Sequence, residues 1–102
     1  MKRSEFINRF KRLRANTGLH GNCGDINRVF FEDVLEVFGY VFSATTVFDN
    51  CVSVEYRRDS FWLRHGLEDY EELFCCEIET QRIINFELFY HYVLSEKLYK
   101  EF

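Results

Sequence analysis

The residues with the most evident chemical potential lie in a glycine-punctuated segment of the chain. His20 stands three residues before Cys23 in the stretch His-Gly-Asn-Cys-Gly-Asp, which leads into an expected helix. A cysteine becomes a nucleophile when a nearby base or a helix N-terminus favours its thiolate. A single Cys/His pair in one loop is a weak signal, and a tight helix–helix connection explains the glycines equally well. We therefore expect no catalytic residue and predict that the protein is not an enzyme.

Metal ligation and acid–base catalysis are the other chemistries that the residue types allow. A zinc site usually needs four ligands in paired spacing, whereas Cys75 and Cys76 are adjacent and would point to opposite faces of a strand. Glu77 and Glu79 would share a strand face about 7 Å apart. Such a pair can hydrolyse glycosides, but so short a chain leaves little room for a sugar cleft. We predict no metal and no cofactor.

The four cysteines, at positions 23, 51, 75 and 76, are predicted to be reduced. The first residues are basic but no apolar stretch follows them, so they do not resemble a secretion signal. No apolar run approaches the roughly 18 residues of a membrane span. We therefore expect a cytoplasmic protein without a membrane segment.

Composition and length predict one domain over residues 1–102. Hydrophobic residues make up 47% of the chain and aromatic residues 19%, including 12 Phe. A chain of this length buries a smaller share of its surface than a large protein does, so a core dense in large side chains is needed for stability. The aromatic content supplies such a core and excludes a disordered chain.

Helices are predicted at 4–17, 26–38 and 86–101. In the first, Phe6, Phe10 and Leu13 recur at helical spacing, and in the last, Asn85 is a suitable N-cap.

Between the second and last helices the pattern favours strands. Strands at 40–48 and 51–56 would be joined by a turn at Asp49-Asn50, and 61–65 would form a third strand. Residues 67–72 are expected to turn and 73–79 to form a fourth strand, although a helix beginning at Glu68 is an equal alternative. The fold class is therefore α+β, with two N-terminal helices, an antiparallel sheet of three to four strands and a C-terminal helix.

The net charge of −4 conceals an uneven distribution. Residues 1–16 carry six basic side chains and one acidic side chain, whereas the rest of the chain is strongly acidic. The densest acidic stretch, 67–80, has six carboxylates and no Lys or Arg. Both regions could be ordinary solvated faces, the acidic one could dock a basic partner, or the basic one could bind nucleic acid.

The alternative interpretation is a small nucleic-acid-binding or regulatory protein. It would use the basic residues of the first helix, Arg9, Lys11, Arg12 and Arg14. These residues spread around the polar arc of the helix rather than forming one stripe, and a pI near 5.4 is unlike that of a dedicated nucleic-acid binder.

The leading interpretation is a non-enzymatic inhibitor of the immunity type. Acidic groups beside amphipathic aromatic rings are typical of protein interfaces. We expect the chain to bind and neutralise a protein with a basic surface, such as a nuclease toxin or a defence complex. The predicted contact residues are Trp62, Glu68, Asp69, Tyr70, Glu71, Glu72, Glu77 and Glu79.

Overall fold

The computed structural model describes the chain except residues 18–24, 43–50, 58–59 and 79–80, together with the side chains of several residues that border those gaps. Four α-helices, two 3-10 helices and four strands are present in the described part, which confirms the α+β class. In chain order the elements are α1 (Arg3–Thr17), α2 (Asp25–Val37), β1 (Tyr40–Phe42), β2 (Cys51–Tyr56), α3 (Phe61–His65), the 3-10 helix η1 (Glu68–Leu73), β3 (Cys75–Ile78), β4 (Gln81–Asn85), α4 (Phe86–Ser95) and the 3-10 helix η2 (Leu98–Glu101).

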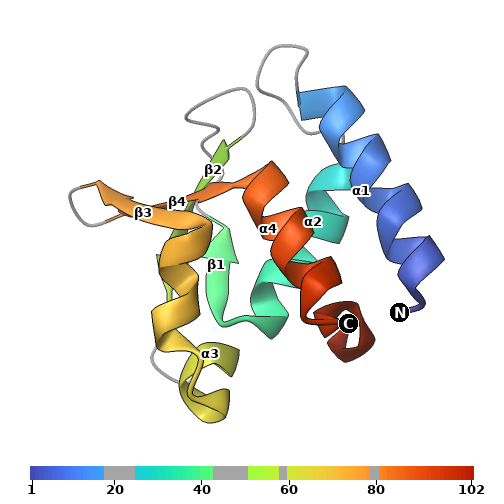
Figure 1. The fold of residues 1–102 in the computed structure, drawn as a ribbon. Coiled ribbons are helices and arrows are strands. Elements are labelled where there is room, and N and C mark those ends of the chain that lie inside the picture. The colour runs from blue at the N-terminus through green and yellow to red at the C-terminus, as the bar shows by residue number, and fades with distance from the viewer. Residues whose placement is uncertain (18–24, 43–50, 58–59, 79–80) are drawn as a thin grey trace.

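The four strands form one antiparallel sheet in the order β1-β2-β4-β3. Tyr40 of β1 lies opposite Tyr56 of β2, and Ile84 of β4 lies opposite both Val52 of β2 and Cys75 of β3. Strand β4 thus enters between β2 and β3, so α3 and η1 connect two strands that are not neighbours. This connection lies at one end of the sheet (Figure 1).

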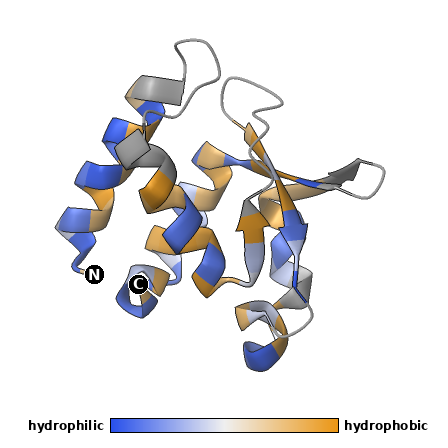
Figure 2. Cartoon of the chain, turned by 180° about the vertical axis from the view of Figure 1, so that it is seen from behind, coloured by the Kyte–Doolittle hydropathy of each residue, from blue (hydrophilic) through white to orange (hydrophobic). Residues whose placement is uncertain are grey.

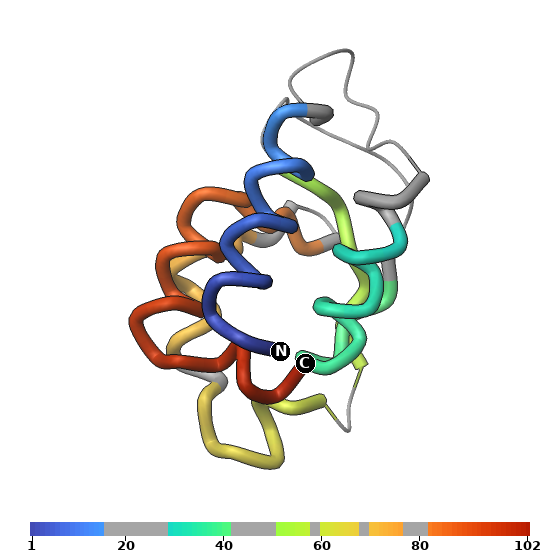
Figure 3. The backbone as a smooth tube through the Cα atoms, turned by 90° about the vertical axis from the view of Figure 1, so that its right-hand side faces the viewer, coloured from blue at the N-terminus to red at the C-terminus, as the bar shows by residue number. Residues whose placement is uncertain are grey.

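The helices stack on the sheet in two layers. Helices α2 and α4 lie beside the sheet, and α1 lies across their outer side (Figures 1 and 3). Edge-to-face packing joins α2 to α4, because the Phe31 ring stands 4.8 Å from the Phe86 ring. The Phe6 ring of α1 lies 5.8 Å from Tyr90 of α4 and 6.3 Å from Phe30 of α2.

The predicted apolar stripe of α1 is confirmed, because Phe6, Phe10 and Leu13 are at most 1% exposed. Outside this stripe α1 is mostly hydrophilic, whereas α4 and the strands are mostly hydrophobic (Figure 2). Helix α1 therefore contributes one face to the core, while α4 lies well inside it.

The predicted third strand at 61–65 is wrong, because these residues form helix α3. The Ser60 hydroxyl accepts a hydrogen bond from the Leu63 N–H at 3.4 Å and caps the start of the helix. Gly66, at φ 65°, ends it in the left-handed conformation. A strand would send Phe61 and Trp62 to opposite faces, whereas the helical turn buries both in one core.

Two further boundaries differ from the predictions. Strand β4 was missed, since its five residues carry no turn signal on either side. Helix α4 begins after the predicted N-cap, Asn85, whose side chain accepts a hydrogen bond from the Leu88 N–H at 3.1 Å. It ends at Ser95 instead of continuing to residue 101, because Lys97 adopts a left-handed conformation at φ 56°.

The remaining predictions for the sheet are confirmed in part. Strands β1 and β2 pair as expected, but the turn at Asp49-Asn50 lies outside the described residues. The fourth predicted strand is present as β3, and the predicted turn is replaced by the 3-10 helix η1, which begins at Glu68 as the helical alternative expected. In the described part of the chain, no helix has the length and apolar character needed to cross a bilayer.

Candidate functional site

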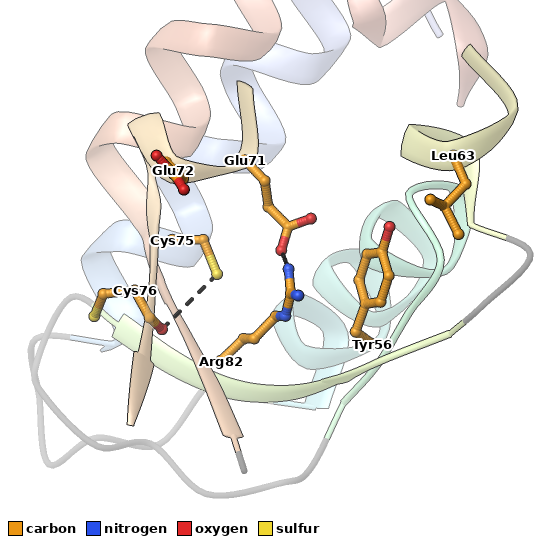
Figure 4. A pocket seen from close by; sticks show the side chains of 7 residues that line it. All are labelled: Tyr56, Leu63, Glu71, Glu72, Cys75, Cys76 and Arg82. Atoms are coloured by element: carbon orange, nitrogen blue, oxygen red, sulfur yellow. Dashed lines mark hydrogen bonds and ion pairs between the residues drawn. The ribbon is translucent and has the colours of Figure 1, made fainter. Parts of the chain in front are cut away.

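A pocket of about 570 Å³ opens between the sheet and the connection formed by α3 and η1 (Figure 4). The residues that line this pocket come from β2, α3, η1, β3 and β4. The register explains this convergence, because β4 carries its arginine between the end of β2 and the edge strand β3. The lining residues are Tyr56, Leu63, Glu71, Glu72, Cys75, Cys76 and Arg82.

A buried ion pair occupies the centre of this pocket. Glu71 of η1 is 4% exposed and pairs through Oε1 with the Arg82 guanidinium of β4 (Figure 4). A buried carboxylate needs such a partner, because the loss of hydration is costly. The Arg82 side chain is itself 32% exposed, so the charge that solvent can reach at the pair belongs to the arginine.

Aromatic packing fixes the position of the arginine. The guanidinium carbon of Arg82 lies 4.3 Å from the centroid of the Tyr56 ring, which is a cation–π geometry. The Tyr56 hydroxyl in turn accepts a hydrogen bond from the Ser60 hydroxyl at 2.8 Å. Because Ser60 also caps α3, the cap of that helix and the wall of the pocket are joined in one network.

Two unsatisfied polar groups lie in the core close to the ion pair. The Tyr40 hydroxyl and the Trp62 indole N–H are buried, and neither makes a hydrogen bond of ordinary geometry to a described residue. Burial raises the pKa of Tyr40 far above its ordinary value; nearby Cys75 raises it further, while Arg82 and Trp62 lower it. The Trp62 N–H lowers this pKa as a hydrogen-bond donor would, so the two buried groups satisfy each other in part.

The described thiols differ in their surroundings. Cys75 Sγ is turned into the pocket and lies 4.0 Å from the Cys76 carbonyl oxygen, whereas Cys76 Sγ points away from Arg82 (Figure 4). Burial raises the pKa of Cys51, and nearby Cys76 adds to that shift. None of these three is in a disulfide, and Cys23 and His20 lie outside the described residues. No group of three potential metal ligands occurs in the part of the chain that the structure describes.

Two of the predicted contact residues cannot touch a partner, because both are buried. Trp62 is 0% exposed and stacks on Phe38 at 4.6 Å, so it belongs to the core and the prediction of an interface anchor is wrong. Glu71 is likewise committed to Arg82 inside the molecule. Since a tryptophan buries more apolar area than any other side chain, an isolated one in a small domain is well placed for core packing.

The other predicted contact residues divide into two groups. Tyr70 is 46% exposed and Glu72 is also exposed, both on η1. The structure does not describe the side chains of the remaining four. Glu68 and Asp69 belong to η1 and Glu77 belongs to β3, whereas Glu79 lies outside the described residues.

Exposed apolar side chains gather on the same connection. Of the five large hydrophobic residues that the structure shows exposed, three lie on α3 and η1: Leu63 at 41%, Tyr70 at 46% and Leu73 at 58%. The other two stand on α2 and α4. Together with Glu72, these three residues define what we call the α3–η1 corner.

The basic residues of α1 take part in contacts within the molecule. Arg9 pairs with Glu5 at 3.2 Å and Arg14 pairs with Glu87 of α4 at 3.0 Å. The Arg14 guanidinium also lies 6.0 Å from the Tyr90 ring. Arg12 also interacts with another residue of the chain, and the side chain of Lys11 is exposed. The arrangement favours surface pairing over one continuous phosphate-binding stripe.

Sequence reasoning did not single out Arg82, Leu63 or Leu73. A signal for Arg82 was present, since it is the sole basic residue between Arg64 and Lys97 and follows the acidic stretch directly. Its partner Glu71 is eleven positions away, and only the pairing of β3 with β4 brings the two together. Comparisons with protein families, with curated proteins and with solved structures found no match.

Proposed function

We propose that this protein is a non-enzymatic inhibitor of the immunity type. It binds and neutralises a partner protein with a basic surface, such as a nuclease toxin or a component of a defence complex. The observation that carries the proposal is the exposure of three apolar side chains on the α3–η1 corner, two of which, Tyr70 and Leu73, lie within the most acidic stretch of the sequence.

The composition of the corner suits a protein interface. Interfaces combine apolar or aromatic anchors with surrounding polar groups that fix orientation. Tyr70 and Leu73 are three residues apart on a 3-10 helix, so their side chains project from the same side. Glu72 stands between them in sequence, and Glu68 and Asp69 precede them. Tyr70 keeps the anchoring role that the sequence suggested for it, and we assign to Leu63 and Leu73 the role suggested for Trp62.

Inhibition would be steric and electrostatic. The carboxylates of η1 attract a basic surface and raise the rate of association, while Tyr70, Leu63 and Leu73 lose water on contact and slow dissociation. A nuclease whose phosphate-binding face is covered in this way cannot reach its substrate. The support for this proposal is exposure and charge, and it involves no covalent step.

The test is capture of the partner by the wild-type chain and by variants of the corner. The tagged protein is cross-linked in the cells that produce it, and the captured protein is identified by mass spectrometry and then purified. Tyr70→Ser with Leu73→Ser is expected to weaken binding of that protein at least about tenfold, since anchors of this kind contribute about 1–2 kcal/mol each. Glu68→Lys with Glu72→Lys is expected to weaken it most at low salt.

Matched controls come from exposed residues elsewhere on the surface. Val29→Ser and Leu88→Ser remove similar apolar exposure on α2 and α4, and Glu101→Lys reverses a charge outside the corner. All three are expected to bind like the wild type. If the control variants weaken binding as much as the corner variants, or if charge reversal in η1 leaves binding unchanged at low salt, the proposed interface is wrong.

A further inference from the structure

The pocket behind the α3–η1 corner shares Leu63 and Glu72 with the proposed protein interface, and its other lining residues have features of a ligand site. We propose that the pocket binds an organic carboxylate, with Arg82 as the residue that recognises the anion. The proposal goes beyond the proposed function and rests on the pocket alone.

The first argument is preorganisation of the arginine. Glu71 holds one side of the guanidinium and the Tyr56 ring covers one face of it, so Arg82 has little freedom left to lose on binding. Among the described residues, Glu71 is the carboxylate paired with this guanidinium. An arginine carries five N–H donors in a fixed fork, and the unused donors can meet both oxygens of a second carboxylate.

The second argument is the sign of the accessible charge. The side chain of Glu71 is 5% exposed, whereas that of Arg82 is 32% exposed, so of these two paired charges a ligand in the pocket reaches the cation. Glu72 lies at the mouth, on the opposite side of the ion pair from Tyr56 (Figure 4). The described lining carries one positive charge against two negative ones, so recognition rests on the directed N–H donors of Arg82, and a singly charged acid is repelled less than a dianion. A phosphate dianion would face two glutamates with one arginine.

The third argument is the shape and lining of the cavity. About 570 Å³ is within the range of small-molecule sites. Leu63 and the edge of Tyr56 offer apolar contact, and the Cys75 thiol lies beside the ion pair (Figure 4). The ligand is therefore an acid with one carboxylate and a short apolar or aromatic group.

Benzoate is a suitable probe, with benzamide and benzylammonium as neutral and cationic counterparts of the same size. Titration followed by calorimetry or by amide chemical shifts is expected to show saturable binding of benzoate with a dissociation constant of about 1 mM or lower. The two counterparts are expected to bind at least about tenfold more weakly, because neither carries a negative charge or offers two acceptor oxygens to a guanidinium.

The location of the ligand is tested by chemistry at the two adjacent thiols. Iodoacetamide alkylates exposed cysteines, and peptide mass spectrometry separates modification at Cys75 from that at Cys76. Saturating benzoate is expected to slow alkylation of Cys75 several-fold and to leave Cys76 unchanged, since only Cys75 Sγ faces the pocket (Figure 4). Equal rates at Cys75 with and without benzoate would place any binding elsewhere and overturn the proposal.

Variants test the role of each charge. Arg82→Met alone would leave Glu71 buried without a partner and could unfold the chain, so Glu71→Gln with Arg82→Met removes both charges together. This double variant is expected to lose benzoate binding at least about tenfold. The control is Arg57→Met, which loses a surface pair with Glu36 and is expected to bind benzoate like the wild type. Retained binding in the folded double variant would overturn the role of Arg82.

Glu72 separates this proposal from the proposed function. Glu72→Gln is expected to strengthen benzoate binding about two- to threefold by removing a like charge at the mouth. The same substitution is expected to weaken binding of a basic partner. Weaker benzoate binding in Glu72→Gln would contradict an anion site, whereas stronger or unchanged partner binding would contradict the acidic interface.

The carboxylate could belong to a free acid or to the C-terminus of a peptide. N-acetylphenylalanine and a hexapeptide ending in Phe present the same terminal group, and the amidated hexapeptide is the control for the charge. Tighter binding of the free hexapeptide identifies a chain terminus as the source, and tighter binding of N-acetylphenylalanine identifies a free acid. Equal binding of the free and amidated hexapeptides together with no binding of N-acetylphenylalanine would overturn carboxylate recognition.

Discussion

At the scale of single residues, burial raises the pKa of each described titratable group whose pKa is shifted. Burial raises the pKa of Tyr92 to about 12, with Glu96 and then Tyr70 adding to the shift. Burial also raises the pKa of Tyr40. Both hydroxyls favour the folded state as neutral groups, and neither is suited to act as a base near neutral pH.

These shifts predict loss of stability at alkaline pH. A group with a higher pKa in the folded state contributes fully below its unfolded pKa, about 10 for tyrosine, and its contribution is lost as the pH rises through the folded value. The free energy of unfolding is therefore expected to fall between about pH 10 and pH 12. Urea unfolding at pH 8, 10 and 11 measures it, and Tyr92→Phe is expected to show a smaller fall.

Absorbance near 295 nm gives an independent readout, because it follows tyrosinate directly. Tyrosines that ionise only with unfolding should appear in the same step as the loss of far-UV dichroism. If all six tyrosines titrate near pH 10 while the dichroism of the folded protein persists, the assignment of Tyr40 and Tyr92 as protected groups is wrong.

At the scale of elements, α3 depends on two glycines of different character. Gly39 ends α2 at φ 85°, and its N–H donates to the Glu36 carbonyl oxygen at 2.9 Å. A Cβ at Gly39 would overlap Ser60, the cap of α3. Gly66 ends α3 at φ 65°, and a Cβ there would meet no atom within 4 Å. The first glycine is required by packing and conformation, the second by conformation alone.

The two glycines therefore make a matched pair of tests. Gly66→Ala is expected to lower the free energy of unfolding by about 1–2 kcal/mol, the cost of a left-handed residue with a side chain. Gly39→Ala is expected to cost more than about 3 kcal/mol, since it adds a steric clash that displaces Ser60. Urea unfolding measures both losses, and equal losses would show that Gly39 and Ser60 are not in close contact.

At the scale of the whole molecule, the ends of the chain close the helical side of the core. The amino group of Met1 donates a hydrogen bond to the Phe102 carbonyl oxygen at 2.7 Å, and the two ends lie side by side (Figure 3). The Phe102 ring is 5.8 Å from Phe6 and 5.4 Å from Phe38. It therefore joins α1 to the end of α2 across η2.

This arrangement predicts that the last residues matter for stability. Phe102→Ala is expected to lower the free energy of unfolding by about 2 kcal/mol, less than for a fully buried phenylalanine because the ring is half-buried. Lys100→Ala is the exposed control and should lie within about 0.5 kcal/mol of the wild type. A loss at Phe102 no larger than at Lys100 would show that the ring packs elsewhere in solution.

The sequence by itself determined the elements whose signals are local. The 3.6-residue spacing of Phe6, Phe10 and Leu13 predicted α1, and Asn85 predicted the start of α4. The acidic stretch was also evident, because charge is read directly from the residues. These features need no knowledge of what packs against them.

Only the tertiary structure decided the features that depend on distant partners. Burial of both Phe61 and Trp62 against Phe38 overrode a strand-like pattern, because one helical turn places two consecutive rings in the same core. Insertion of β4 between β2 and β3 brought Arg82 to Glu71 and turned a carboxylate of the acidic stretch inward. Burial of a charge is favourable only beside its partner, and strand pairing, which the sequence pattern left open, set that contact.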